Sequence, residues 1–110
     1  MQQHKITSIS FDIDQPFDFF ALNFLLGNIE THLGENLYRI KGFVYAEGFE
    51  QRMIVQFVAL THIWQSGTEW QKNEQRKTKL VFIGKGLKKD NILKHLEMCL
   101  IKDQETGRLV

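Results

Sequence analysis

The chain has 110 residues, of which 43% are hydrophobic and 25% charged, and its formal net charge is +1. Since one folded core needs on the order of 100 residues, a second domain is excluded, and the composition excludes a disordered tail and a collagen-like fibre. No apolar run approaches the roughly 20 residues of a membrane-spanning helix, and the N-terminus lacks the layout of a secretory signal. We therefore expect a single cytoplasmic domain over 1–110, with an ordered core over about 4–101 and a polar tail over 102–110.

The N-terminal third predicts a strand followed by a helix. Residues 4–13 alternate between apolar and polar side chains, which is typical of a strand. The helix should run from about Pro16 to Leu33, because proline fits a first helical turn and Asp14 or Gln15 can cap it. Apolar residues recur along this segment at three- and four-residue steps, which predicts a wide stripe packed on a sheet. The stripe comprises Phe17, Phe20, Leu22, Phe24, Leu25, Leu26, Ile29 and Leu33.

The rest of the chain predicts short strands and a second helix. Residues 37–46 alternate again, and a β-branched and aromatic stretch over 52–64 should bend or break near Ala59. Asp90 is expected to cap the last helix. The segments expected after the break are a short strand over 68–71, a polar loop over 72–79, a buried strand over 80–84 and a helix from Asp90 to about Ile101.

This order of elements, β-α-β-β-β-β-α, predicts the fold class. The connections are short, which favours a mainly antiparallel sheet with two helices on one face, an α+β two-layer sandwich. Phe17, Phe24, Leu26 and Leu96 should share its core. The order of the strands within the sheet stays open.

Motifs for catalysis or metal binding are missing from the sequence. Gly84-Lys85-Gly86 lacks the spacing of a phosphate-binding loop, so we expect no nucleotide hydrolysis by this chain. The histidines stand singly, which argues against a zinc or cobalt site. Cys99 cannot form an intramolecular disulfide as the single cysteine, and its place on a predicted apolar stripe indicates a buried thiol. We expect a chain that is not an enzyme and has no catalytic, cofactor-binding or metal-binding residues.

Several segments match a known family in order and spacing. They are Pro16-Phe17-Asp18, Tyr38-Arg39-Ile40-Lys41-Gly42-Phe43, Gln56-Phe57-Val58, Trp70, Leu80-Val81-Phe82-Ile83-Gly84 and the helix from Asp90 to near Cys99. Together they resemble the CobW C-terminal domain, over roughly Lys5 to Ile101. That domain is the second half of CobW-type P-loop GTPases, a cobalamin-synthesis and metal-handling class thought to deliver zinc or cobalt to client proteins.

The resemblance implies a non-catalytic interaction or regulatory domain of a GTP-dependent zinc or cobalt chaperone, involved in cobalamin biosynthesis or zinc homeostasis. Its implied partners are a CobW-type GTPase domain, in cis or trans, and a metalloprotein client. GTP, Mg and the transported metal are implied only for a full-length member, because the GTPase half is absent here. Phe57 departs from the glycine that the family often has, and the chain ends in QETGRLV rather than a histidine-rich tail. We expect either a domain excised from a larger GTPase or a small stand-alone relative.

The resemblance also marks individual residues. Arg39 and Lys41 match paired cations on one strand face, and Gly42 follows where a side chain would obstruct a neighbouring backbone; these three form the candidate interaction surface. A structural alternative pairs Arg39 with Glu47 or Glu50 across a hairpin. Trp70 is expected to close the open side of the sheet as an aromatic plug. The matched positions with structural roles are Pro16, Gln56, Trp70, Gly84 and Asp90.

An uneven distribution of charge supports a second hypothesis. Residues 1–71 carry four Lys or Arg against eight acids, whereas residues 72–102 carry nine against three, a local net charge of +6. Interleaved with Trp70 and Phe82, this basic segment is also typical of a small nucleic-acid-binding α+β module. RNP-type motifs are absent, and a solvated loop and helix face would have the same composition. Nucleic acid is therefore the less favoured partner.

Overall fold

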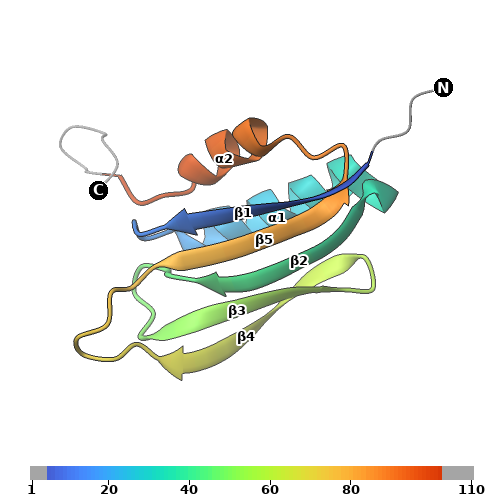
Figure 1. The fold of residues 1–110 in the computed structure, drawn as a ribbon. Coiled ribbons are helices and arrows are strands. Elements are labelled where there is room, and N and C mark those ends of the chain that lie inside the picture. Colours follow the sequence, from blue (N-terminus) through green and yellow to red (C-terminus); the bar gives the residue numbers. More distant parts are fainter. Residues whose placement is uncertain (1–4, 103–110) are drawn as a thin grey trace.

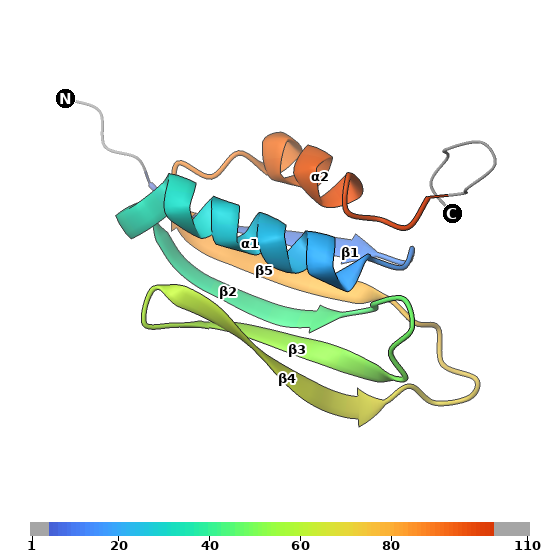
Figure 2. The same cartoon turned by 180° about the vertical axis from the view of Figure 1, so that it is seen from behind.

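The fold is a five-stranded antiparallel sheet with two helices on one face (Figures 1 and 2). The computed structural model describes residues 5–102, so residue 4 and the predicted tail from 103 onward lie outside the described residues. The elements in chain order are β1 (Ile6–Ile13), α1 (Phe19–Leu33), a short 3-10 turn η1 (Gly34–Asn36), β2 (Leu37–Val44), β3 (Gln51–Val58), β4 (Thr61–Glu69), β5 (Thr78–Lys85) and α2 (Lys89–Glu97). The predicted α+β class and element order are confirmed.

The strand order, which the sequence left open, is β1-β5-β2-β3-β4. The last strand of the chain, β5, therefore lies between β1 and β2, where Phe82 stands opposite Ile9 on one side and Ile40 on the other. Since opposed residues in an antiparallel pair share a face, this register places Ile40 and Phe82 on the helix side, where both are fully buried.

The core lies between the sheet and the helices. Phe17, Leu26 and Leu96 are fully buried in it, as predicted, but Phe24 is 72% exposed and Phe20 is 78% exposed. Residues of a helix are about 100° apart, so these two phenylalanines lie on the side of α1 that faces away from the sheet, while Leu22, Leu25 and Leu26 face the sheet. The predicted stripe was too wide.

The start of α1 differs from the prediction. The helix begins at Phe19, and its cap is Asp18, whose carboxylate accepts the backbone N–H groups of Phe20 and Ala21 at 3.1 and 3.2 Å. Neither Asp14 nor Gln15 is the cap. The helix cannot begin earlier, because the carbonyl oxygens of Pro16 and Phe17 accept the N–H groups of Ile101 and Glu47, both at 2.9 Å, instead of those four residues further along the chain. The Phe17 and Asp18 N–H groups also have distant partners, the carbonyls of Tyr45 at 3.0 Å and Cys99 at 2.8 Å. We call Pro16-Phe17-Asp18 the strap.

Other boundaries shift by a few residues. The predicted break near Ala59 is confirmed as the β3–β4 turn, where Ala59 and Leu60 have φ angles of 53° and 70°. Trp70 lies just after β4 rather than in a strand of its own. The last helix is Lys89–Glu97, with Asp90 in its first turn instead of at the cap, and it ends before the predicted Ile101. Neither helix in the described part has the length and apolarity needed to cross a membrane.

Candidate functional site

Arg39 and Lys41 lie on the face of the sheet that the helices leave uncovered, toward the viewer in Figure 1. Lys41 stands opposite Val81 of β5 and Gln56 of β3, and Arg39 stands opposite Ile83. We call this surface the open face. Its residues in strand order are Ile6, Ser8, Ser10 and Asp12; Lys79, Val81, Ile83 and Lys85; Arg39, Lys41 and Phe43; Arg52, Ile54, Gln56 and Val58; Thr61, Ile63 and Gln65.

Cations dominate the open face. Arg39, Lys41, Lys79 and Lys85 are exposed, and within residues 5–102 none of the four forms an ion pair. The structural alternative for Arg39 is not observed among these residues: Arg39 forms no ion pair with Glu47 or Glu50, and Glu50 pairs with Arg76 at 3.3 Å. The four free cations therefore produce a positive potential over an uncovered surface.

Apolar side chains fill the spaces between these cations. Val81, Ile83, Phe43 and Ile54 are half-buried, and they alternate with Arg39, Lys41 and Lys79 across β5, β2 and β3. A solvated sheet face normally carries polar residues at such positions. Apolar contact area mixed with arginine is the composition of protein–protein interfaces.

Gly42 sets the distance between the two strands that carry the free cations. Its φ is 151°, and a Cβ there would lie 2.0 Å from the carbonyl oxygen of Lys79 and 3.0 Å from the Leu80 Cα. Because both atoms belong to the backbone of β5, no side-chain rotation relieves the overlap. Gly42 therefore has a structural role, which aligns Arg39 and Lys41 with the lysines of β5.

Trp70 closes one end of the open face. It is 8% exposed and packs against Phe43 and Tyr45, with ring centroids 6.2 and 6.1 Å away. The Arg52 guanidinium lies 4.4 Å from the centroid of the Trp70 ring and is also paired with Glu74. This cation is therefore engaged within the domain, unlike Arg39 and Lys41.

The nucleic-acid hypothesis loses its stacking residues in this arrangement. Phe82 is fully buried on the helix side of the sheet, and Trp70 is buried among its aromatic neighbours. Neither ring therefore has a free surface on which a base could stack. The basic segment is also divided, since Lys79 and Lys85 lie on the open face while Lys88 and Lys94 belong to the helix layer. The charges of residues 72–102 do not form one continuous surface.

The histidines in the described part have two separate locations. His62 joins β4 to α1: its Nδ1 lies 2.6 Å from a Glu30 carboxylate oxygen, and its Nε2 lies 2.6 Å from the Asn23 Oδ1. The Trp64 indole N–H donates to the same Asn23 Oδ1 at 2.8 Å, so one amide oxygen holds both aromatic side chains of β4 against α1. This network supports the fold and contains no open position. His32 and His95 line a cavity between the helices, and residues 5–102 contain no cluster of three or more metal-ligating side chains.

Cys99 is buried as predicted, so its reactivity reports on the closure of the strap. Burial raises the pKa of the thiol, and the negative charge of Asp18 raises it further. We expect reaction with Ellman's reagent at mildly alkaline pH to be at least about 100-fold slower in the folded protein than in guanidinium chloride. If Cys99 of the folded protein reacted as fast as in the unfolded chain, the contact between the Asp18 N–H and the Cys99 carbonyl would open readily.

The family assignment follows from comparison with known proteins. The model of the cobalamin synthesis protein cobW C-terminal domain matches residues 6–100, nearly the whole chain. The chain belongs to this family. The resemblance to the CobW C-terminal domain that the sequence motifs predicted over about Lys5 to Ile101 is thus confirmed.

Two solved structures share the fold of this cobW C-terminal domain. They are the Zn(II)-bound YjiA GTPase from E. coli and a Zn(II)-bound triple mutant of the YjiA GTPase. Each matches with a TM-score of 0.81 and 24% sequence identity over 87% of this chain. The chain spans only 30% of the length of either GTPase chain.

The family-motif positions of the cobW C-terminal domain are dispersed over the fold. Gln56 lies on the open face beside Lys41, and Gly84 lets β5 approach the backbone that precedes β2. Pro16 lies in the strap, and Asp90 is exposed on α2. Only Gln56 among these four adjoins the free cations.

Lys79 and Lys85 are members of the open face that the sequence-based predictions missed. The strand predicted over 80–84 ended just short of both residues, although their period-two spacing with Val81 and Ile83 places all four on one face. That spacing was a usable signal. Their position beside Arg39 and Lys41 additionally required the insertion of β5 next to β2.

Proposed function

We propose that this cobW C-terminal domain is the non-catalytic docking and regulatory part of a GTP-dependent zinc or cobalt chaperone. In this proposal the open face binds an acidic surface of a CobW-type GTPase domain. The GTPase, with this domain docked on it, transfers metal to a metalloprotein client. Family membership and the fold shared with a zinc-bound GTPase support the assignment to this class. The same class suggests a place in zinc homeostasis or cobalamin biosynthesis.

The observation that carries the proposal is the set of free cations on the open face. Arg39, Lys41, Lys79 and Lys85 are held on two adjacent strands, without ion pairs to described residues and with apolar side chains between them. Opposite charge on a partner accelerates association and fixes its orientation, while the apolar positions supply contact area that excludes water. A GTPase-state-dependent change in the partner's acidic surface would then alter docking.

Reversal of Arg39 and Lys41 tests this docking. The Arg39→Glu/Lys41→Glu variant should bind a CobW-type GTPase domain from the same organism at least about 30-fold more weakly, since two interfacial charge pairs contribute on the order of 1 kcal/mol each. The measurement is a calorimetric titration with the GTP-loaded and GDP-loaded domain. Because both residues are exposed, circular dichroism and the urea midpoint should stay unchanged.

A matched control keeps the change in net charge constant. The Lys88→Glu/Lys94→Glu variant alters two exposed residues of the helix layer and should bind the GTPase domain within about threefold of the unmodified protein. Equal losses in the two double variants would refute docking at the open face. Tight binding of mixed oligonucleotides at about 0.15 M salt, with affinity falling by roughly 0.7 log units per contacted phosphate for each decade of salt, would instead favour the nucleic-acid hypothesis.

A further inference from the structure

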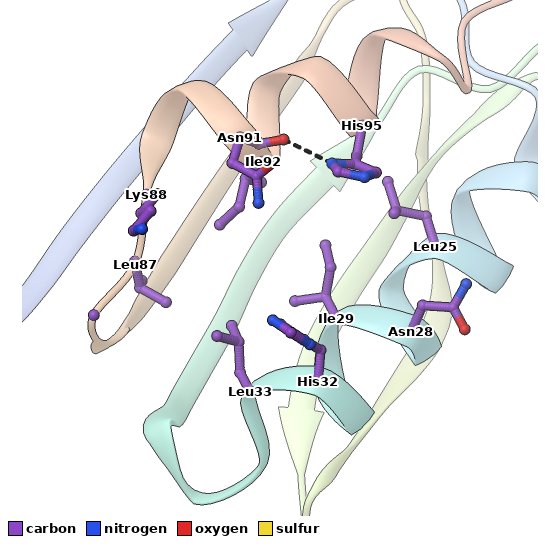
Figure 3. Close-up of a pocket in the computed structure, with 11 residues that line it drawn as sticks. Leu25, Asn28, Ile29, His32, Leu33, Leu87, Lys88, Asn91, Ile92 and His95 are labelled. Carbon is purple, nitrogen blue, oxygen red and sulfur yellow. Dashed lines mark hydrogen bonds between the residues drawn. The ribbon is translucent and has the colours of Figure 1, made fainter.

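A cavity of about 430 Å³ lies between the C-terminal half of α1, the β5–α2 loop and α2 (Figure 3). We call it the interhelix groove. It belongs to the helix layer and is therefore separate from the open face. Its floor is apolar: Leu25, Ile29 and Leu33 approach from α1, and Leu87 and Ile92 from the opposite side. The volume falls within the roughly 300–1,000 Å³ that is usual for small-molecule sites.

The rim of the interhelix groove is basic and polar. Lys88, His32 and His95 line it together with the amide side chains of Asn28 and Asn91, and all five residues are exposed. The residues lining the groove, all within the described part of the chain, include neither aspartate nor glutamate. An apolar floor with a rim of cationic and amide donors matches a ligand that is apolar at one end and anionic at the other.

The side chains that line the interhelix groove favour an anion over a metal ion. The His95 Nδ1 lies 2.8 Å from the Asn91 carbonyl oxygen, which only accepts, so Nδ1 carries a proton and is engaged within α2 (Figure 3). This hydrogen bond fixes the ring at the rim of the groove. A metal ion would find only two imidazoles here, without the carboxylate or thiolate ligands that complete a tetrahedral shell. The Lys88 ammonium would also repel it.

We propose that the interhelix groove binds a small amphipathic anion, with its apolar chain on the Leu25–Ile29–Leu33 wall and its carboxylate or phosphate against Lys88 and the amide groups of the rim. This site is independent of the docking function, because it uses the helix layer and none of the residues of the open face. The headgroup chemistry, an oxyanion on an aliphatic chain, defines the ligand class.

A titration followed by ¹H–¹⁵N correlation spectra tests the proposal, with sodium octanoate and octyl phosphate as probes below their micellar concentrations. We expect saturable shifts confined to the amides of residues 25–33 and 86–95, with a Kd on the order of 0.1–1 mM for the better probe. The two headgroups distinguish a carboxylate from a phosphate source. Neutral octanol should bind at least about fivefold more weakly, and cationic octylamine should cause no saturable shift.

A pair of single variants locates the headgroup. Lys88→Glu should weaken binding of the better probe by about fivefold or more, whereas Lys94→Glu, an equal charge change at an exposed position of α2 outside the groove, should change it by less than about twofold. Equal affinity for octanol and octanoate, or equal effects of the two variants, would overturn the proposal. So would zinc chloride that shifts the same amides with micromolar saturation, since the groove would then be a cation site.

Discussion

Replacement of Gly42 by alanine is expected to lower the free energy of unfolding by about 3 kcal/mol or more. The added Cβ would lie 2.0 Å from the Lys79 carbonyl oxygen, inside the β2–β5 pair that joins the two halves of the sheet. Relief requires β2 and β5 to separate, and that movement breaks ladder hydrogen bonds and opens the core beneath Ile40 and Phe82. Domains of this size are stable by only about 5–15 kcal/mol, so the loss is a large fraction of the total.

Urea unfolding followed by tryptophan fluorescence measures this effect, and Gly27→Ala is its matched control. Gly27 lies in the interior of α1, and no atom from outside its own stretch of helix backbone lies within 4 Å of the position that an added Cβ would take, so alanine should raise stability by about 0.5–1 kcal/mol through helix propensity. The same substitution thus has opposite signs at the two sites. A Gly42→Ala variant within about 0.5 kcal/mol of the unmodified protein would show that β5 moves aside without cost.

The fold class was accessible from the sequence because local periodicity carries it. Alternation in residues 4–13 and 37–46 identified two strands within a few residues of their true ends, and the break near Ala59 separated β3 from β4. Strand order was not accessible, since the pairing of β1 with β5 depends on contacts between segments about 70 residues apart. Periodicity also failed at Phe24, because the spacing of apolar positions does not say how wide a stripe the sheet covers.

The candidate site was accessible to the same extent. Two-residue spacing placed Arg39 and Lys41 on one face, and the glycine after them suggested a close approach of another backbone. The structure has this approach, since a Cβ added at Gly42 would lie 2.0 Å from the Lys79 carbonyl oxygen. The contribution of β5 required its place beside β2. The sequence also could not tell that Phe82 faces the helices, and that orientation removes a stacking platform for bases from the open face.

Replacement of Phe17 by alanine is expected to lower the free energy of unfolding by about 3–5 kcal/mol, the range for loss of a buried phenylalanine. Phe17 is fully buried, and its backbone forms bridges to Ala46 after β2 and to Leu100 after α2. The strap therefore joins two segments, around Ala46 and around Leu100, that are distant from it and from each other in sequence. Truncating the ring leaves a cavity where these segments meet, and rigid backbone hydrogen bonds on both sides limit its collapse.

Phe24→Ala is the control for this prediction, because it removes the same ring from a side chain that is 72% exposed and should change stability by no more than about 0.5 kcal/mol. Thermal unfolding should separate the two variants by about 10 °C or more, at roughly 4 °C per kcal/mol for a domain of this length. The rate of Cys99 modification distinguishes the mechanisms, since Asp18 donates its backbone N–H to the Cys99 carbonyl. If Phe17 holds the strap against the segment after α2, the Cys99 thiol should react faster in the folded Phe17→Ala variant than in the folded Phe24→Ala variant. Equal protection of the thiol in both variants would limit the role of Phe17 to the hydrophobic core.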